Sequence, residues 1–394
     1  MNILICGGGI GGLTAALCLA GYGHEVTVFE AGEFGEIGAG IQLSPNCSRV
    51  LHALGLEDAL RARAFLPEGI QFRHWRNGRV IGESALGDAV VTRYGTPYYH
   101  IHRGDLLRVL VEAADRAPNV LLRANARVSG FDQHARGVEV AIGDGVNQLE
   151  VYKGDVLIGA DGIHSIIRAG LWGSEKPRFT GNVAWRALVP VERLPQGLVR
   201  PMSTAWWGPQ RHFVHYYVRG GSLVNCVCVV EKDGWEVESW TTPGDYDELK
   251  ADFAGWHRDI HQLIDNADKD SLYKWALFDR PPMSQWGRDR VTLLGDACHP
   301  TLPFMAQGAA MAIEDSAVLA GCLEQGDPVA ASLQRYEDLR RSRTAGVQNG
   351  SRRNAKMFHL SGIKAWLRNR AVRAGGNRAM EALYSYNALE VTNS

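Results

Sequence analysis

The sequence has no excess of charge, no long apolar run and no cysteine pattern typical of metal sites. Its 42 Lys and Arg residues nearly balance its 43 Asp and Glu residues, which leaves a formal net charge of −1. We therefore expect no nucleic-acid partner and no membrane partner. No stretch is long and apolar enough to span a bilayer. Strand-like residues begin at Asn2, so no secretory signal is expected.

The seven cysteines are scattered along the 394 residues. Cys226 and Cys228 are one residue apart in an apparent strand, where their side chains would point to opposite faces. This usage favours buried, reduced thiols in a cytoplasmic protein and predicts no metal site. The length suffices for two structural units that share one ligand.

A glycine cluster follows the first apolar segment of the chain. Residues 3–6 read as a buried strand and residues 13–20 as an apolar helix, and between them Gly7, Gly9 and Gly12 fit the G-x-G-x-x-G spacing. Such glycines permit a tight turn, close approach of a pyrophosphate, and close packing of helix on strand. The second strand, "EVTVFE", ends at Glu30, where a carboxylate can bind ribose hydroxyls. This order predicts an adenine dinucleotide site, with NAD or FAD left open.

The rest of the chain contains two kinds of segment, one typical of antiparallel sheets and one typical of strand–turn–helix units. Residues 120–151 alternate like antiparallel strands, with "GDGVN" as a hairpin signal, and residues 179–230 resemble a mixed or antiparallel sheet rich in aromatic residues. The segments "DVLIGADGIHSIIR" (155–168) and 290–323 return to a strand, a glycine turn and a helix. The sequence therefore predicts a dinucleotide-binding fold that is interrupted by a substrate domain.

Three motifs together resemble the signatures of single-component (class A) FAD-dependent aromatic hydroxylases of the para-hydroxybenzoate hydroxylase-like class. They are the glycine fingerprint, "GADGIHSIIR" (159–168) and "LLGDACHP" (293–300). The similarity is greatest to the branch of salicylate hydroxylase, 3-hydroxybenzoate 6-hydroxylase and 6-hydroxynicotinate 3-monooxygenase. No second glycine fingerprint follows, which agrees with a class in which NADH or NADPH docks transiently on the FAD domain.

The resemblance implies an α/β fold with a discontinuous, Rossmann-like FAD-binding domain of the GR2 type and a mixed β-sheet substrate domain. We assign residues 1–70, 98–175 and 281–345 to the first, residues 71–97 and 176–280 to the second, and residues 346–394 to a C-terminal helical segment. The resemblance is compatible with a homodimer.

The resemblance also implies which residues hold FAD. They are Gly7, Gly9, Gly12, Glu30, Arg103, Asp161, Gly162, Gly295, Asp296 and Gly308. Asp161 would serve FAD and the incoming nicotinamide, and Asp296 would contact the ribityl chain. The alternatives are that Asp161 and Asp296 are turn or cap residues and that Arg103 only begins a surface helix.

In this family, reduced flavin and O₂ form a C4a-hydroperoxide that transfers oxygen to an electron-rich ring. Because a phenol has a pKa of about 10, a base must help to form the phenolate at neutral pH. In a strand over "RHFVHYYV", His212 and Tyr216 share one face, and they match a His/Tyr pair of this branch. We assign them to phenol activation and substrate binding. A register error of one residue would substitute His215 and Tyr217.

The loop "HPTLPFMAQG" (299–308) is expected to run along the flavin ring. By resemblance, Pro300 covers the site of oxygen activation, Gln307 reaches the reacting region, and Phe304 supplies an apolar wall. Phe304 and Met305 can alternatively be plain core residues. The helix that starts near Gly308 would point its N-terminal N–H groups toward the flavin.

Two further pocket positions narrow the substrate. The 6-hydroxynicotinate enzymes carry histidine where this chain has Gln42 and cysteine where it has Ser203. We therefore expect a monohydroxylated aromatic acid of the salicylate or 3-hydroxybenzoate type, with Arg186 or Arg219 as a possible partner for its carboxylate. The alternatives are a 6-hydroxynicotinate-type hydroxylase, an NAD-dependent dehydrogenase, and a flavin-binding redox protein that hydroxylates nothing.

Overall fold

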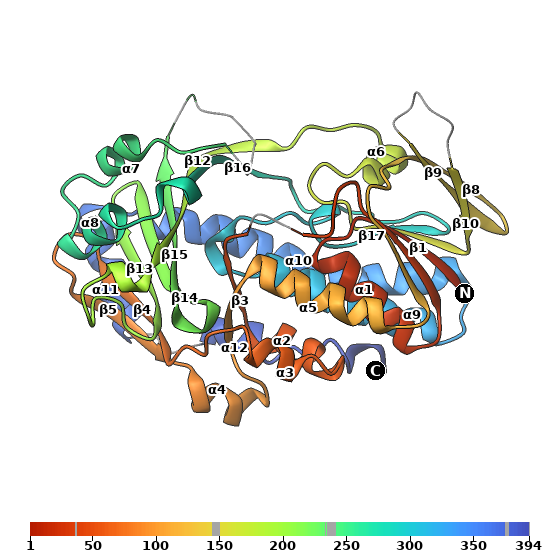
Figure 1. Cartoon of the computed structure of the whole chain (residues 1–394), viewed down its shortest axis with the longest axis horizontal. Coiled ribbons are helices and arrows are strands. Elements are labelled where there is room, and N and C mark those ends of the chain that lie inside the picture. Colours follow the sequence, from red (N-terminus) through yellow and green to blue (C-terminus); the bar gives the residue numbers. More distant parts are fainter. Residues whose placement is uncertain (36–37, 144–149, 233, 235–241, 375–377, 394) are drawn as a thin grey trace.

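The computed structural model of the chain describes residues 1–35, 38–143, 150–232, 234, 242–374 and 378–393. Figure 1 shows two main β-sheets toward opposite ends of the long axis, with long helices running between them. None of the helices in this described part combines the length and the apolar character needed to cross a bilayer.

The first sheet has five parallel strands in the order β17–β11–β1–β2–β7. Ile3, Ile5 and Ile158 in its middle strands are fully buried, as expected of a parallel sheet covered on both faces. The strands are β1 (Asn2–Cys6), β2 (Glu25–Phe29), β7 (Val120–Arg123), β11 (Val156–Gly159) and β17 (Val291–Leu293). The Rossmann-like sheet is thereby confirmed.

Helices and a small antiparallel sheet cover this parallel sheet. Helix α1 (Ile10–Gly21) packs against both α5 (Arg103–Arg116) and α9 (Gly308–Glu324). The small sheet has the order β10–β9–β8 and contributes to the same core. Its strands are β8 (Val128–His134), β9 (Gly137–Ile142) and β10 (Glu150–Gly154).

The expectation of antiparallel strands over residues 120–151 is correct for β8, β9 and β10 but wrong for β7. Strand β7 follows α5 and returns parallel to β2, as a strand–helix–strand crossover requires. Most of the "GDGVN" hairpin signal falls on residues 144–149, which lie outside the described residues.

The second main sheet has seven strands in the order β16–β12–β15–β14–β13–β4–β5, antiparallel except for the β13–β4 pair. One face packs on α7 (Tyr246–Asp252) and α8 (Arg258–Asp265), and the other packs on the 302–304 loop and the C-terminal helices. The strands are β4 (Gly69–His74), β5 (Val80–Ala85), β12 (Arg178–Pro190), β13 (Met202–Gly208), β14 (Arg211–Val218), β15 (Leu223–Glu231) and β16 (Tyr273–Asp279).

The remaining elements connect and cover the two sheets. The 30-residue helix α10 (Val329–Phe358) runs from the parallel sheet toward the seven-stranded sheet (Figure 1). The others are β3 (Gly40–Leu43) paired with β6 (Tyr99–His102), α2 (Pro45–Ala53), α3 (Glu57–Arg61), α4 (Gly87–Tyr94), α6 (Ile166–Trp172), α11 (Gly362–Ala374) and α12 (Arg378–Tyr384).

A buried cluster of charges joins α9 to α10. The Arg340 guanidinium donates to Asp315 Oδ1 and to Glu314 Oε2, each at 2.7 Å, and all three side chains are fully buried. Asp315 Oδ2 also accepts a bond from the Gly295 amide at 3.1 Å and lies 2.6 Å from His299 Nε2. Burial alone would raise the pKa of both carboxyls, but the neighbouring cations more than offset it, so both pKa values are lowered.

Replacing Arg340 by Met should destabilise the fold by about 3 kcal/mol, because two buried carboxylates each lose one cationic partner, although Asp315 keeps His299 and Glu314 keeps Arg343, each at 2.6 Å. The folded-state pKa values of both carboxyls are depressed, so their stabilising contribution is present above the unfolded values and is lost as the pH falls. The difference between the wild type and Arg340→Met should therefore shrink below about pH 4. Urea unfolding, followed by circular dichroism at several pH values, measures this difference in the free energy of unfolding. Arg61→Met, at an exposed ion pair, is the matched control, and equal effects of the two substitutions would contradict the prediction.

Candidate active site

The glycine turn after β1 has the geometry that the fingerprint predicts. Gly7 has a φ of +106°, and a Cβ there would lie 2.4 Å from the Ala160 carbonyl oxygen. A Cβ on Gly12 would lie 2.0 Å from the Gly7 carbonyl oxygen, so helix and strand pack without space for a side chain. A Cβ on Gly9 would meet nothing within 4 Å. The N-terminus of α1 is therefore open at Gly9, where a phosphate group can approach.

Glu30 holds this turn in place. Its Oε2 accepts a hydrogen bond from the Gly8 amide at 2.8 Å, and its Oε1 accepts one from the Gly32 amide at 3.1 Å. Each carboxylate oxygen has a second lone pair, so these bonds leave acceptor capacity for ribose hydroxyls. A hollow of about 320 Å³ lies nearby and is lined by Phe34, Gly35, Gly104, Arg108 and Val111.

Asp161 acts as a cap residue at the start of α6, which is the alternative that the sequence leaves open for it. Its Oδ2 accepts bonds from the amides of Ile166 at 2.8 Å and Ile167 at 3.2 Å, at the start of α6. Its Oδ1 is buried and accepts no hydrogen bond from a described residue, and burial raises the pKa of the carboxyl. Gly162 follows with a φ of +76°. One oxygen is therefore used by the fold, and the other is left for a further donor.

The third carboxylate, Asp296, is exposed in the short 3₁₀ turn η4 (Gly295–Ala297). Gly295 has a φ of +65° there. Solvent reaches the Asp296 side chain, yet the surrounding protein desolvates its carboxyl and raises the pKa, against the charges of His299 and Arg103. The charge of Arg103, at the start of α5, is therefore near enough to act on the Asp296 carboxyl. At Gly308 an added Cβ would meet only Thr301 at 3.5 Å, so this position matters as the N-terminus of α9.

The three carboxylates converge at one edge of the parallel sheet. Phe29, Cys6, Gly159 and Leu293 are paired in one row across β2, β1, β11 and β17, and each ends its strand. Glu30, Asp161 and Asp296 follow three of these four residues by one to three positions. With strands about 4.8 Å apart, the row spans roughly 15 Å. Ligands of parallel sheets bind at this carboxyl edge.

In β14 the two side-chain faces are as the sequence predicts. His212 and Val214 face the side of Phe304 and α10, whereas Phe213 packs on the α7 and α8 side. The His212 and Phe304 rings meet edge to face at 5.2 Å. On the opposite face, His215 Nε2 accepts a bond from Trp206 Nε1 at 3.0 Å. The structure therefore places His212, and not His215, beside the 299–308 loop.

Tyr216 lies at the other end of the same face, in a polar group that also contains the predicted pocket residues Gln42 and Ser203. Gln42 donates from Nε2 to Ser203 Oγ at 3.0 Å and accepts from the Tyr98 hydroxyl at 2.6 Å. Burial raises the pKa of Tyr216, although hydrogen bonding to Asn225 and Gln42 acts in the other direction. Sequence reasoning missed Tyr98 and Asn225, because nothing local marks a residue that becomes polar lining only through tertiary contact.

Between these two ends, the floor of the site is apolar and partly open. Val214 lies between His212 and Tyr216 on the strand and pairs with Val227 of β15, and both valines are only half-buried. His212 and Tyr216 are four residues apart, which in a strand is about 13 Å between Cα atoms. A single aromatic ring is short enough to lie over this floor between them.

The loop over the site is fixed by the core. The Pro300 carbonyl accepts a bond from Gln348 Nε2 at 3.0 Å. Gln307 is buried, donates from Nε2 to Ser44 Oγ at 3.0 Å and accepts from Asn46 Nδ2 at 3.1 Å. Its amide is therefore engaged inside the protein, which differs from the expected reach toward the reacting region and fits a positioning role better.

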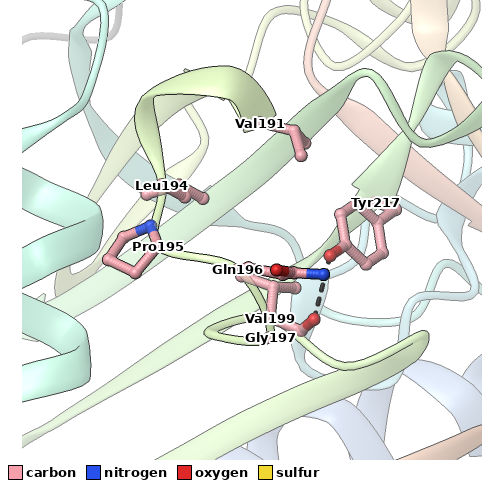
Figure 2. Close-up of a pocket in the computed structure, with 7 residues that line it drawn as sticks. All are labelled: Val191, Leu194, Pro195, Gln196, Gly197, Val199 and Tyr217. Carbon is pink, nitrogen blue, oxygen red and sulfur yellow. Dashed lines mark hydrogen bonds between the residues drawn. The ribbon is translucent and has the colours of Figure 1, made fainter.

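Two further observations bound the site. A second hollow has a volume of about 320 Å³. Figure 2 shows the residues that line it, among them Tyr217 and Val199. The Tyr217 hydroxyl donates to the Val199 carbonyl at 2.9 Å. Because Tyr217 lies on the α7 and α8 face of β14, this hollow is separate from the floor described above. Within the described residues, no three His, Cys, Asp or Glu side chains are grouped as metal ligands would be.

Similarity to known proteins agrees with this geometry. Residues 1–351 match a family profile described as FAD binding domain. The chain is 41% identical over 374 residues to the 3-amino-4-hydroxybenzoate 2-monooxygenase PtnB3 of Streptomyces platensis, with 94% of this chain and 92% of that protein covered. It is 37% identical over 394 residues to the 3-hydroxybenzoate 6-hydroxylase of Polaromonas naphthalenivorans, with 98% and 96% covered.

A 6-hydroxynicotinate 3-monooxygenase of Bordetella bronchiseptica is also 37% identical, over 357 residues, with 90% of this chain and 91% of that protein covered. Among solved structures, Klebsiella pneumoniae HpxO complexed with FAD and uric acid superposes with a TM-score of 0.86 at 27% identity, with 99% of this chain and 97% of that chain covered. The chain therefore belongs to the FAD binding domain family and is an FAD-dependent aromatic monooxygenase.

Proposed function

We propose that this enzyme hydroxylates a small monohydroxylated aromatic acid, of the 3-hydroxybenzoate or salicylate type, with NADH or NADPH and O₂ as co-substrates. The observation that carries the proposal is the face of β14 on which the half-buried Val214 lies between His212 at one end and Tyr216 at the other, with the 299–308 loop beside it. Bound FAD, once reduced, would supply the activated oxygen.

The parallel-sheet unit would hold FAD, with the boundaries given from the sequence. Gly7, Gly9 and Gly12 would admit the pyrophosphate, with Arg103 near the phosphates. Glu30 would bind the adenosine ribose, and Asp296 would contact the ribityl chain. Gly9 is open, and Asp296 is exposed in the same row of strand ends, so the residues present fit the cofactor. Because all seven cysteines are buried and unpaired, a cytoplasmic enzyme is consistent with them. A homodimer stays a prediction.

His212 would accept the phenolic proton. Burial holds its pKa well below the ordinary value, so the ring is neutral near pH 7 and can act as an acceptor. Its hydrogen bond within the described residues, to His359, uses Nδ1 and not Nε2. Phe304 and the loop around it would keep water from the reacting atoms.

Arg186 is the better placed of the two candidate cations for the substrate carboxylate. It is 2% exposed, lies on the same sheet face as Ala184, and pairs across the sheet with Val227 of the floor. Its guanidinium stacks on Tyr273 at 4.8 Å. Arg219, in contrast, is half-exposed and paired with Asp105 at 3.3 Å.

A pyridine substrate of the 6-hydroxynicotinate type is the second candidate, because a relative with that name is as similar as the 3-hydroxybenzoate enzyme. The Gln42–Ser203 bond stands where that branch has histidine and cysteine, which favours the hydroxybenzoate reading. A flavin-binding redox protein that hydroxylates nothing is the third.

A substrate panel should identify the acid. The panel contains salicylate, 3-hydroxybenzoate, 3-amino-4-hydroxybenzoate and 6-hydroxynicotinate, scored for stimulated NAD(P)H and O₂ consumption and for product by mass spectrometry. We expect a hydroxybenzoate to give the highest kcat/KM. Its carboxamide should lose at least about tenfold, since a lost charge-assisted bond is worth about 1.5–3 kcal/mol. Unchanged rates with every ring would contradict hydroxylation, and a preference for 6-hydroxynicotinate would support the alternative.

Replacing His212 by Gln should leave FAD bound and lower kcat for coupled hydroxylation by about 100-fold or more, because the base is lost. The matched variant His215→Gln changes the buried histidine on the opposite face, so its turnover should stay near the wild-type value. Steady-state assays of product formation measure kcat, and the FAD absorbance of the purified proteins measures the bound cofactor. A loss of activity confined to His215→Gln would favour the alternative pair.

A further inference from the structure

A chain of hydrogen bonds leads from the catalytic candidate His212 to the protein surface. His212 Nδ1 lies 2.8 Å from His359 Nε2, and His359 Nδ1 lies 2.7 Å from Glu231 Oε1. The three residues come from β14, from the end of α10, and from the end of β15. His359 is 147 positions from His212, in the part of the sequence that carried no motif.

The order of these groups fixes where the protons are. A carboxylate only accepts, so His359 must carry its proton on Nδ1 to donate to Glu231. Neutral His359 then has a bare Nε2, which accepts the proton on His212 Nδ1. His212 Nε2 is left without a proton, and this is the ring nitrogen that the bond to His359 does not use.

The backbone around His359 holds it in register with the sheet. The His359 carbonyl accepts a bond from the Gln210 amide at 3.3 Å, and the Gln210 carbonyl accepts one from the Glu231 amide at 2.8 Å. Arg368 Nη1 donates to the carbonyls of Met357 and Phe358 at 2.8 and 2.9 Å, which closes the end of α10. The contact between the two histidine rings is thus anchored from both sides.

Burial and charge are graded along the chain of bonds. His212 and His359 are 3% and 7% exposed, whereas the Glu231 side chain is 43% exposed. Burial lowers the pKa of both histidines, and a charge on His359 lowers that of His212 further, so His359 has to stay neutral to support it. The charges of Arg211 and Arg368 lower the pKa of His359, against the effect of Glu231. An isolated His212 would be a weak base for a phenol, so a negative charge behind it is needed.

We propose that Glu231 and His359 are positioning residues that hold His212 in the tautomer with Nε2 free and stabilise its protonated form. This inference rests on the proposed role of His212. In the step, the phenolic O–H bond breaks and an Nε2–H bond forms on His212. The resulting imidazolium donates from Nδ1 to His359, whose own Nδ1–H donates to the Glu231 carboxylate. The proton returns from Nε2 to the ring oxygen when the product regains its aromatic form. The arrangement follows the logic of a base oriented by a second group.

The test uses the FAD-loaded full-length enzyme with ¹⁵N-labelled histidine. NMR should show His212, assigned by its loss in His212→Gln, with a protonated Nδ1 and a bare Nε2. In Glu231→Gln the side-chain amide can donate as well as accept, so the His212 signals should shift to a mixture of tautomers. Glu231→Asp keeps the charge and should restore most of the wild-type pattern. His359→Phe should remove the fixed tautomer altogether.

Turnover gives the second readout. Glu231→Gln should lower kcat about tenfold, a part of the 10²–10⁴ that general-base catalysis contributes, with little change in KM or FAD content. Glu57→Gln, at another exposed carboxylate, is the control and should be unchanged. A single, wild-type His212 tautomer with undiminished kcat in Glu231→Gln would by itself overturn the inference, and the same result in His359→Phe would do so as well. If His212→Gln is also fully active, the proposed role of His212 as the base is wrong, whereas the proposed function fails only if no ring of the substrate panel stimulates turnover. Glu231 is exposed, so its variants remain informative even if His359→Phe does not fold.

Discussion

Four neighbouring parallel strands end in one row, and the cofactor side of the site depends on this constraint. Phe29, Cys6, Gly159 and Leu293 are in register across the sheet, so whatever follows them in the chain must emerge at the same edge. Segments about 130 residues apart in the sequence thereby meet at one edge of the sheet, and no direct contact between their side chains is required. The glycines after β1 and in η4 then leave the backbone bare where a large ligand has to lie against it.

The parts that could be predicted from the sequence are those with a local physical signature. The spacing of Gly7, Gly9 and Gly12 carries the turn, and the two-residue period of a strand separates His212 from His215. The orientation of strand β7 is predicted wrongly, because a short apolar run has the same residue pattern in a parallel strand as in an antiparallel one. Two sets of contacts had no local signature: the engagement of Gln307 with α2, and the approach of His359 to His212. Both are made by packing between elements far apart in the chain.

The two interpretations of Asp161 are compatible with each other. Its Oδ2 accepts the amide hydrogen bonds at the start of α6, and its Oδ1 is the oxygen that a bound cofactor would use. Asp315 likewise uses its two carboxylate oxygens differently: Oδ2 accepts from the Gly295 amide, and Oδ1 accepts from Arg340. The loop that would face the flavin is thus tied to the same buried charges that join α9 to α10, and its position is set by the core rather than by solvent.

Helix α10 carries one anchor at Arg340, in the buried charge cluster, and ends at the second, His359, beside the substrate sheet. About 19 residues of rigid helix separate them, or roughly 28 Å and a little over five turns. Inserting or deleting one residue between the anchors would rotate the second by about 100° relative to the first. The number of residues between Arg340 and His359 is therefore fixed by the fold. Insertions and deletions in this stretch should be far less tolerated during evolution than substitutions on its solvent face.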